Sequence, residues 1–294
     1  TAFGLNAAAA GADSLAFGTN AAASVKNTIA LGLNSKSSAE NATALGLGAN
    51  ASANDTVAIG TNAAASVKNT IALGVNSKSS AENATAFGLN AAAAGADSLA
   101  FGSAARTSDV NSIALGNQAA ASKANTIALG TQTKAAGANA IALGNQADAS
   151  VFQSIALGTS AKASAADTVA LGTGSIASGN SAIALGNKAQ ALGSNSISIG
   201  KGNIVSGNNS AAIGDPTTVN GAGTYVYGND NGTIDANNSG VFGNNNTITG
   251  ALDGVRVIGN ANTVSANGAM VMGNKATVSA ADGVALGSNT SVTQ

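Results

Sequence analysis

A glycine returns at a fixed spacing along this chain, and the spacing limits what the chain can fold into. From Gly4 to Gly228 the step is always 14 residues. The last four such glycines follow at steps of 15, 16, 14 and 14, at Gly243, Gly259, Gly273 and Gly287. Residues 1–18 also recur identically at 85–102. A stack of equivalent coils tolerates duplication in register, whereas a globular core does not.

The residues around each glycine, which we number position 0, predict two short strands per coil. Position −1 is large and apolar in every unit, as in NSIALG at 111–116, and apolar residues alternate around it. Alternation indicates a strand, and it argues against the helix that the many alanines would otherwise suggest. A second strand is expected at positions +3 to +5. The sequence therefore predicts an all-β, parallel β-roll solenoid of 14-residue coils.

Alternation places positions −1 and −3 on one side of the first strand and position −2 on the other. We assign the large residues to the interior of the coil, so position −2 is predicted to face outward. It is Ala in most units and Val in four. An outward apolar face predicts that sister copies cover it; the alternative is that a small alanine is simply tolerated there. The predicted interface comprises Ala30, Ala44, Ala58, Ala72, Ala114, Ala128, Ala142, Ala156, Val226, Val257 and Val271.

Charged residues are expected on the outside of the second strand, at position +4. The basic ones are Lys36, Lys78, Arg106, Lys134 and Lys162. They could face an acidic ligand or form an ordinary solvated surface. Arg256 is the one charge at position −3, which we assign to the interior. It could hold a buried anion or pair with Asp253. Alternatively, the 16-residue coil shifts the register and places Arg256 outside, which is the interpretation that we favour.

Composition excludes several classes of protein. The chain has no His and no Cys, so the usual nucleophile–base pairs and transition-metal sites lack their parts, and we expect neither an enzyme nor a cofactor. Twelve Lys and Arg residues among 294, with a net charge of −1, do not make a nucleic-acid footprint. No apolar run is long enough for a membrane helix. Asp55 and the aspartates equivalent to it take a turn position that is mostly Asn, which favours backbone hydrogen bonding over acid catalysis.

The unit [ND]-[ST]-[IV]-A-[LI]-G, seen most fully in NTIALGLNS (27–35) and NTIALGVNS (69–77), resembles the head repeat of trimeric autotransporter adhesins, a YadA-like head. The resemblance implies a left-handed β-roll in a side-by-side homotrimer that turns the first strand towards the shared axis. It also implies a cell-surface location, with an anchor in the Gram-negative outer membrane. Signal, neck, coiled-coil stalk and anchor are not found here, so we expect an excised, soluble head fragment. Regular repeats are expected over 1–200. Residues 201–294 should form variant, Asn- and Val-rich coils of the same head, with a thicker core.

The expected function is attachment to extracellular matrix, host cells or abiotic surfaces. The partners would be sister copies and the adhesion target, with membrane contact only through the missing anchor. An ice-binding solenoid or a phage-type trimeric fibre without an adhesive role remains the alternative. An acyltransferase of the hexapeptide-repeat type is set aside, because its chemistry normally needs His.

Overall fold

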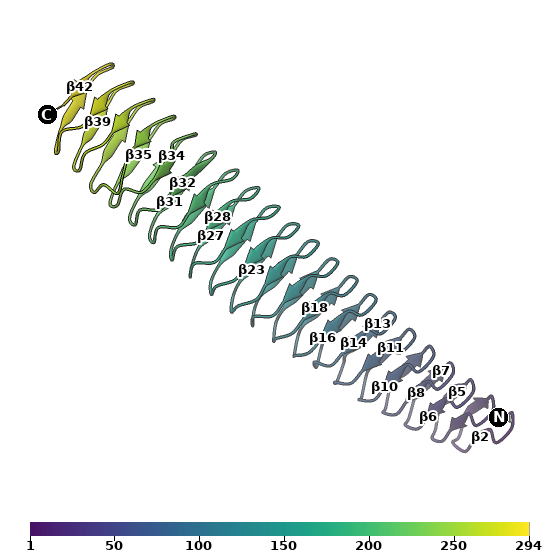
Figure 1. Cartoon of the computed structure of the whole chain (residues 1–294). Coiled ribbons are helices and arrows are strands. Elements are labelled where there is room, and N and C mark those ends of the chain that lie inside the picture. The colour runs from purple at the N-terminus through teal and green to yellow at the C-terminus, as the bar shows by residue number, and fades with distance from the viewer. Residues whose placement is uncertain (294) are drawn as a thin grey trace. The chain divides into compact units, whose positions relative to one another are not determined.

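The computed structural model describes residues 1–293, and every regular element in them is a β-strand. The chain divides into two compact units, Thr1–Ala147 and Asp148–Gln294, and each is described by itself. Each unit is a parallel β-solenoid in which two strands and two turns make one coil of about 14 residues (Figure 1). The predicted all-β, parallel solenoid of 14-residue coils is confirmed.

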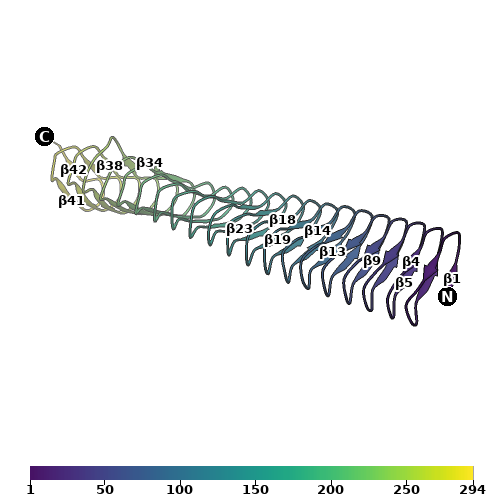
Figure 2. The same cartoon turned by 90° about the horizontal axis from the view of Figure 1, so that it is seen from below.

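In the first unit, the first strands of the coils form one parallel sheet and the second strands form another (Figure 2). The first strands are β1 (Ala2–Phe3), β3 (Leu15–Phe17), β5 (Ile29–Leu31), β7 (Thr43–Leu45), β9 (Val57–Ile59), β11 (Ile71–Leu73), β13 (Thr85–Phe87), β15 (Leu99–Phe101), β17 (Ile113–Leu115), β19 (Ile127–Leu129) and β21 (Ile141–Leu143). The second strands are β2 (Ala8–Ala9), β4 (Ala22–Ala23), β6 (Lys36–Ser37), β8 (Asn50–Ala51), β10 (Ala64–Ala65), β12 (Lys78–Ser79), β14 (Ala92–Ala93), β16 (Arg106–Thr107), β18 (Ala120–Ala121) and β20 (Lys134–Ala135).

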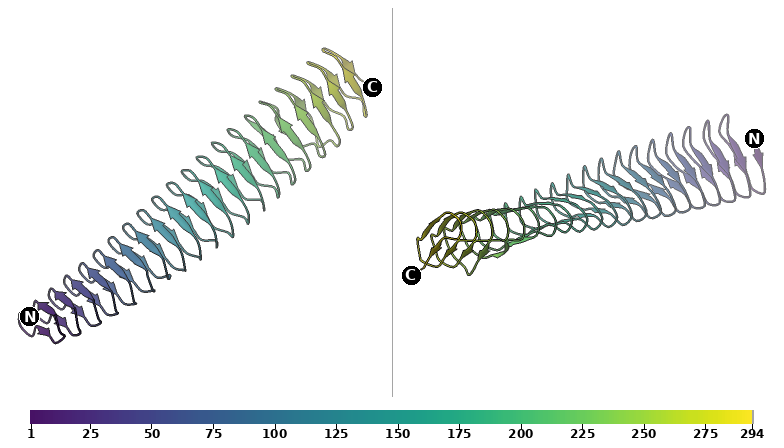
Figure 3. Two further views of the ribbon diagram at one scale, coloured as in Figure 1. Left: turned by 180° about the vertical axis from the view of Figure 1, so that it is seen from behind. Right: turned by 90° about the horizontal axis from the view of Figure 1, so that it is seen from above.

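The second unit repeats this plan (Figure 3). Its first strands are β23 (Ile155–Leu157), β25 (Val169–Leu171), β27 (Ile183–Leu185), β29 (Ile197–Ile199), β31 (Ala211–Ile213), β33 (Tyr225–Tyr227), β35 (Gly240–Phe242), β37 (Arg256–Ile258), β39 (Met270–Met272) and β41 (Val284–Leu286). Its second strands are β22 (Asp148–Ala149), β24 (Lys162–Ala163), β26 (Ile176–Ala177), β28 (Gln190–Ala191), β30 (Ile204–Val205), β32 (Thr217–Val219), β34 (Gly232–Ile234), β36 (Thr247–Ile248), β38 (Thr263–Val264), β40 (Thr277–Val278) and β42 (Ser291–Val292).

Equivalent residues of successive coils lie side by side. Ala114 of β17 pairs in parallel with Ala128 of β19, one period later. The 15- and 16-residue coils keep this alignment, since Gly240 pairs with Tyr225 on one side and with Arg256 on the other. Their extra residues fall in the turns between β33 and β34 and between β36 and β37. The insertions therefore leave the register of the first strands unchanged, whereas β34 and β36 belong to different sheets of second strands.

Two residues per coil adopt the left-handed conformation, at positions +2 and −5. Asn34 and Asn27 do so with φ of 58° each, a conformation that Asn and Asp tolerate better than most residues. Their side chains also bond to the coils beside them, as when Asn41 Nδ2 donates to Asp55 Oδ1 at 2.9 Å. Asp55 itself has φ of 58° and so takes the same turn conformation, but its carboxylate bonds to the Asn41 side chain, whereas backbone hydrogen bonding was expected.

The glycine at position 0 is required by the backbone. Gly116 has φ of 136°, and a Cβ built on it would lie 2.3 Å from the carbonyl oxygen of Gly130 in the next coil. Both the conformation and the close approach of the neighbouring coil exclude a side chain there. The recurring glycine is thus a place where the backbones of stacked coils approach closely.

The interior of the first unit is filled by small side chains. Each coil points four positions inward: −4 and −2 from the first strand and its approach, and +3 and +5 from the second. In the coil of Gly46 all four are alanines, namely Ala42, Ala44, Ala49 and Ala51, and none is exposed. Where Ser or Thr takes such a place it bonds to the backbone, as Ser37 Oγ does to Ala42 O at 2.7 Å.

The predicted facing of the first strand was wrong. Positions −1 and −3 point outward, and position −2 points into the coil. The residues assigned to the trimer interface are all at most 1% exposed within their own chain: Ala30, Ala44, Ala58, Ala72, Ala114, Ala128, Ala142, Ala156, Val226, Val257 and Val271. In the first unit the interior is filled by Ala, Ser and Thr and leaves no room for Leu, Ile or Phe, so the large side chains of the first strand lie outside. A side chain enclosed by its own coil cannot contact a sister copy.

The core becomes thicker after residue 200, as predicted. Val205, Val219 and Val264 at position +5 are fully buried and cluster with the inward valines of position −2. Buried asparagines at position +3 bond from coil to coil here. Asn246 Nδ2 donates to Asn231 Oδ1 at 3.0 Å and to Gly259 O at 2.9 Å, which satisfies amide groups that would otherwise be costly to bury.

We expect Gly116→Ala to lower the free energy of unfolding by about 2 kcal/mol or more, because it adds left-handed strain to a backbone clash. Gly240→Ala is the matched control. Gly240 has no positive φ, and the nearest atoms to an added Cβ lie 3.6 and 3.7 Å away. Thermal unfolding followed by circular dichroism would measure both, and equal stability of the two variants would contradict this account.

Ala128→Leu should destabilise the first unit by about 1–3 kcal/mol, because the interior has no room for the added carbons. Ala120→Leu, on the outer side of β18, should change stability by about 0.5 kcal/mol at most. Denaturant unfolding of the two variants would compare the inward and outward alanines directly. A larger loss from the outward substitution would reverse the assignment of the faces.

Candidate functional site

Each unit exposes one apolar face, formed by positions −1 and −3 of its first strands. Ile113 and Leu115 of β17 are 38% and 37% exposed, and Phe17 of β3 is 51% exposed. In the first unit the exposed large residues of this kind are Phe3, Leu15, Phe17, Ile29, Leu45, Ile59, Ile71, Phe87, Leu99, Phe101, Ile113, Leu115, Ile127 and Leu143. We call this surface, in each unit, the apolar face. A folded single chain rarely leaves so continuous an apolar surface open to water.

Equivalent side chains stack on one another along this face. The rings of Phe87 and Phe101 lie 4.5 Å apart at 5°, and those of Tyr227 and Phe242 lie 5.1 Å apart at the same angle. The stacking follows from the register, because parallel strands place position −1 of one coil beside position −1 of the next. Leu33 and Leu47 at position +1, each 46% exposed, widen the face towards the turn.

The opposite surface carries the second strands and is polar. Lys36, Lys78, Arg106, Lys134 and Lys162 are all exposed and outward, as predicted. In the first unit, β12, β16 and β20 lie in alternate coils and each carries one cation, so these cations are about 10 Å apart. From β36 onward, position +4 is threonine or serine and exposed. This surface offers regular charge and hydroxyl groups, and a shallow pocket of about 320 Å³ lies beside Arg106.

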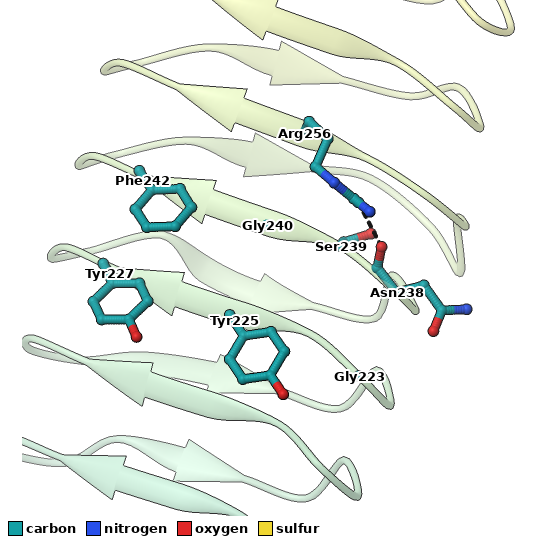
Figure 4. A pocket seen from close by; sticks show the side chains of 8 residues that line it. All are labelled: Gly223, Tyr225, Tyr227, Asn238, Ser239, Gly240, Phe242 and Arg256. Carbon is teal, nitrogen blue, oxygen red and sulfur yellow. Dashed lines mark hydrogen bonds between the residues drawn. The ribbon is translucent and has the colours of Figure 1, made fainter.

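Arg256 interrupts the apolar face of the second unit. Arg256 lies outside, as the favoured interpretation predicted, but the physical reason is different. Its strand stays in register with its neighbours, and position −3 of the strand faces outward. Its Nη1 donates to the carbonyl oxygens of Asn238 and Val255 (Figure 4). Asp253 instead accepts a hydrogen bond from Asn238 Nδ2 at 2.8 Å, and within residues 1–293 no ion pair joins it to Arg256.

A shallow pocket of about 450 Å³ lies beside Arg256. Gly240 forms its floor, because it is the one residue at position −3 without a side chain, and Tyr225, Tyr227, Phe242 and Arg256 surround it (Figure 4). Sequence reasoning singled out Arg256 but missed the pocket. A glycine between a tyrosine and an arginine at equivalent positions was the available signal.

The described part of the chain, residues 1–293, shows no assembly of catalytic or metal-binding groups. No three His, Cys, Asp or Glu side chains come together there as metal ligands would. The same residues contain no helix of the length and hydropathy needed to cross a membrane. The apolar face is the main candidate for function, because it is a continuous apolar surface that its own chain leaves uncovered.

Comparison with protein families agrees with the coil geometry. The model described as "YadA head domain repeat (2 copies)" matches residues 1–21, 9–35, 23–49, 37–63, 68–91, 93–119, 121–147, 152–175, 177–203 and 265–290. Residues 204–264, which include the longer coils and the pocket, lie outside these matches. No curated protein matches the chain. Because the matched segments make up well over half of the sequence and follow its 14-residue step, the chain belongs to the family of YadA head domain repeats.

Proposed function

We propose that this chain is the head of a trimeric bacterial surface adhesin, in which three copies pack their apolar faces together. The observation that carries the proposal is the apolar face itself. Family membership supports a trimeric adhesin head, and the family resemblance adds a left-handed coil and an outer-membrane anchor elsewhere in the full-length protein.

The energetics favour covering this face with identical copies. Each coil offers two large apolar side chains, and burying the exposed part of each contributes on the order of 1 kcal/mol. A single coil thus contributes little, but every coil repeats the contribution. Three copies of one chain have the same spacing between coils, so side chains that meet in one layer also meet in the next. No other partner matches that spacing so simply.

Adhesion would then use the surfaces that remain open, above all the outer side of the second strands. Matrix proteins, host cells and abiotic surfaces are the proposed targets. Repeated cations such as Lys78, Arg106 and Lys134 supply many equivalent weak contacts rather than one strong site. Contacts that are weak singly can hold a surface firmly when many form at once.

Sedimentation should give a species of three times the chain mass of 27.6 kDa. Introducing two charges on the apolar face, with Ile113→Asp and Leu115→Asp, should shift the protein towards monomer, because carboxylates would be buried between copies. Ala120→Asp places a charge on the opposite surface and should leave the mass unchanged. A wild-type chain that stays monomeric at micromolar concentration would contradict the proposed assembly.

Neutralising the outward cations tests the adhesive surface. We expect Lys→Gln at 36, 78, 134 and 162 together with Arg106→Gln to weaken binding by about tenfold to a target chosen from collagen, fibronectin, a glycan and polystyrene. Each such charge contributes about 0.2–1 kcal/mol. Asn50→Ala with Gln190→Ala, on the same surface, should bind like wild type. Unchanged binding of the neutralised variant would show that these cations form an ordinary solvated surface with no role in adhesion.

A further inference from the structure

Arg256 is the only charged residue at the outward positions −1 and −3 of the first strands, and all other residues there are apolar or uncharged. It extends from β37 across Gly240 of β35, with its Cδ 3.7 Å from where a Cβ of Gly240 would be (Figure 4). If sister copies cover the apolar face, this cation is removed from water. A buried guanidinium is costly unless a negative partner accompanies it.

The guanidinium is only partly satisfied by its own chain. Its Nη1 donates to Asn238 O and Val255 O, whereas within residues 1–293 no acceptor is bonded to Nε or Nη2. Those two nitrogens form the side of the planar group that can bind two oxygens of one oxyanion in parallel. Asp253 is engaged by Asn238, and no carboxylate lines the pocket.

Gly240 is not needed by the backbone, unlike the glycines at position 0. It has no positive φ, and a Cβ there would meet only ordinary contacts, with Phe242 Cε2 at 3.6 Å and Arg256 Cδ at 3.7 Å. The residue therefore does not relieve strain. Its effect is to leave space between Tyr225 and Arg256, where the other coils mostly have an apolar side chain.

We propose that Arg256, Tyr225 and the gap at Gly240 form a binding site for a small tetrahedral oxyanion of the phosphate or sulfate class, completed when sister copies close over the apolar face. The inference rests on the proposed trimer. The free side of the guanidinium binds two anion oxygens, and the ring of Tyr225 forms a wall of the same pocket. The bound anion neutralises the arginine inside the assembly.

The test measures binding of inorganic phosphate to the full chain by calorimetry at constant ionic strength. The wild-type trimer should bind phosphate. Arg256→Met should bind at least about tenfold more weakly while remaining a trimer, because charge-assisted hydrogen bonds are lost. Lys123→Met removes one exposed cation from a turn of the first unit and should bind like wild type.

Two further variants separate this site from a structural role of Arg256. Gly240→Val fills the gap as side chains do in neighbouring coils, and it should abolish phosphate binding without loss of trimer stability. The Ile113→Asp, Leu115→Asp variant, once its mass is shown to be monomeric, should bind far more weakly than the trimer. Equally tight binding by that monomer would overturn the role of the sister copies.

Other outcomes overturn the inference in distinguishable ways. A trimer that binds no phosphate, or an Arg256→Met trimer that binds it as well as wild type, would refute the site but leave the proposed assembly intact. A wild-type monomer would remove the assembly and the site together.

Discussion

The separation between the two strand layers of a coil is the constraint on which the rest of the structure depends. In the first unit it leaves room for little more than a methyl or hydroxymethyl group, so Ala, Ser and Thr fill the interior. Neighbouring coils also approach each other closely, because their backbones leave no room for a side chain at Gly116 and its equivalents. Such an interior buries little apolar surface per residue. Backbone hydrogen bonds between coils and side-chain hydrogen bonds at the turns therefore contribute much of the stabilisation of the fold.

Large apolar residues in such a coil have no place inside, and their exposure follows from the same constraint. A solenoid of this kind therefore has its bulkiest side chains on its surface, where the proposed trimer would cover them. Membership of the YadA head repeat family gives this surface a natural partner in sister copies, and the proposed adhesive role depends on that association. Stability and function are then linked through one face.

The second unit shows how the plan changes when the interior widens. Valines and isoleucines replace alanines at the inward positions, and buried asparagines bond from one coil to the next. The coils of 15 and 16 residues absorb their extra residues in turns, which keeps Arg256 in the outward row. This region lies outside the family matches. Its apolar face carries the pocket beside Arg256.

The sequence by itself determined the period, the strands, the turns and the parallel stacking, because a glycine every 14 residues and strict alternation permit little else. It also determined that one strand has apolar residues on both sides. Only the tertiary structure decided which side is the interior. Alternation is symmetric, and the usual expectation that large residues lie inside, applied to Ile113 and Leu115, pointed the wrong way. The small residues at +3 and +5, such as Ala119 and Ala121, indicated the correct assignment. An interior that has room only for methyl groups from one strand has no room for leucines from the other.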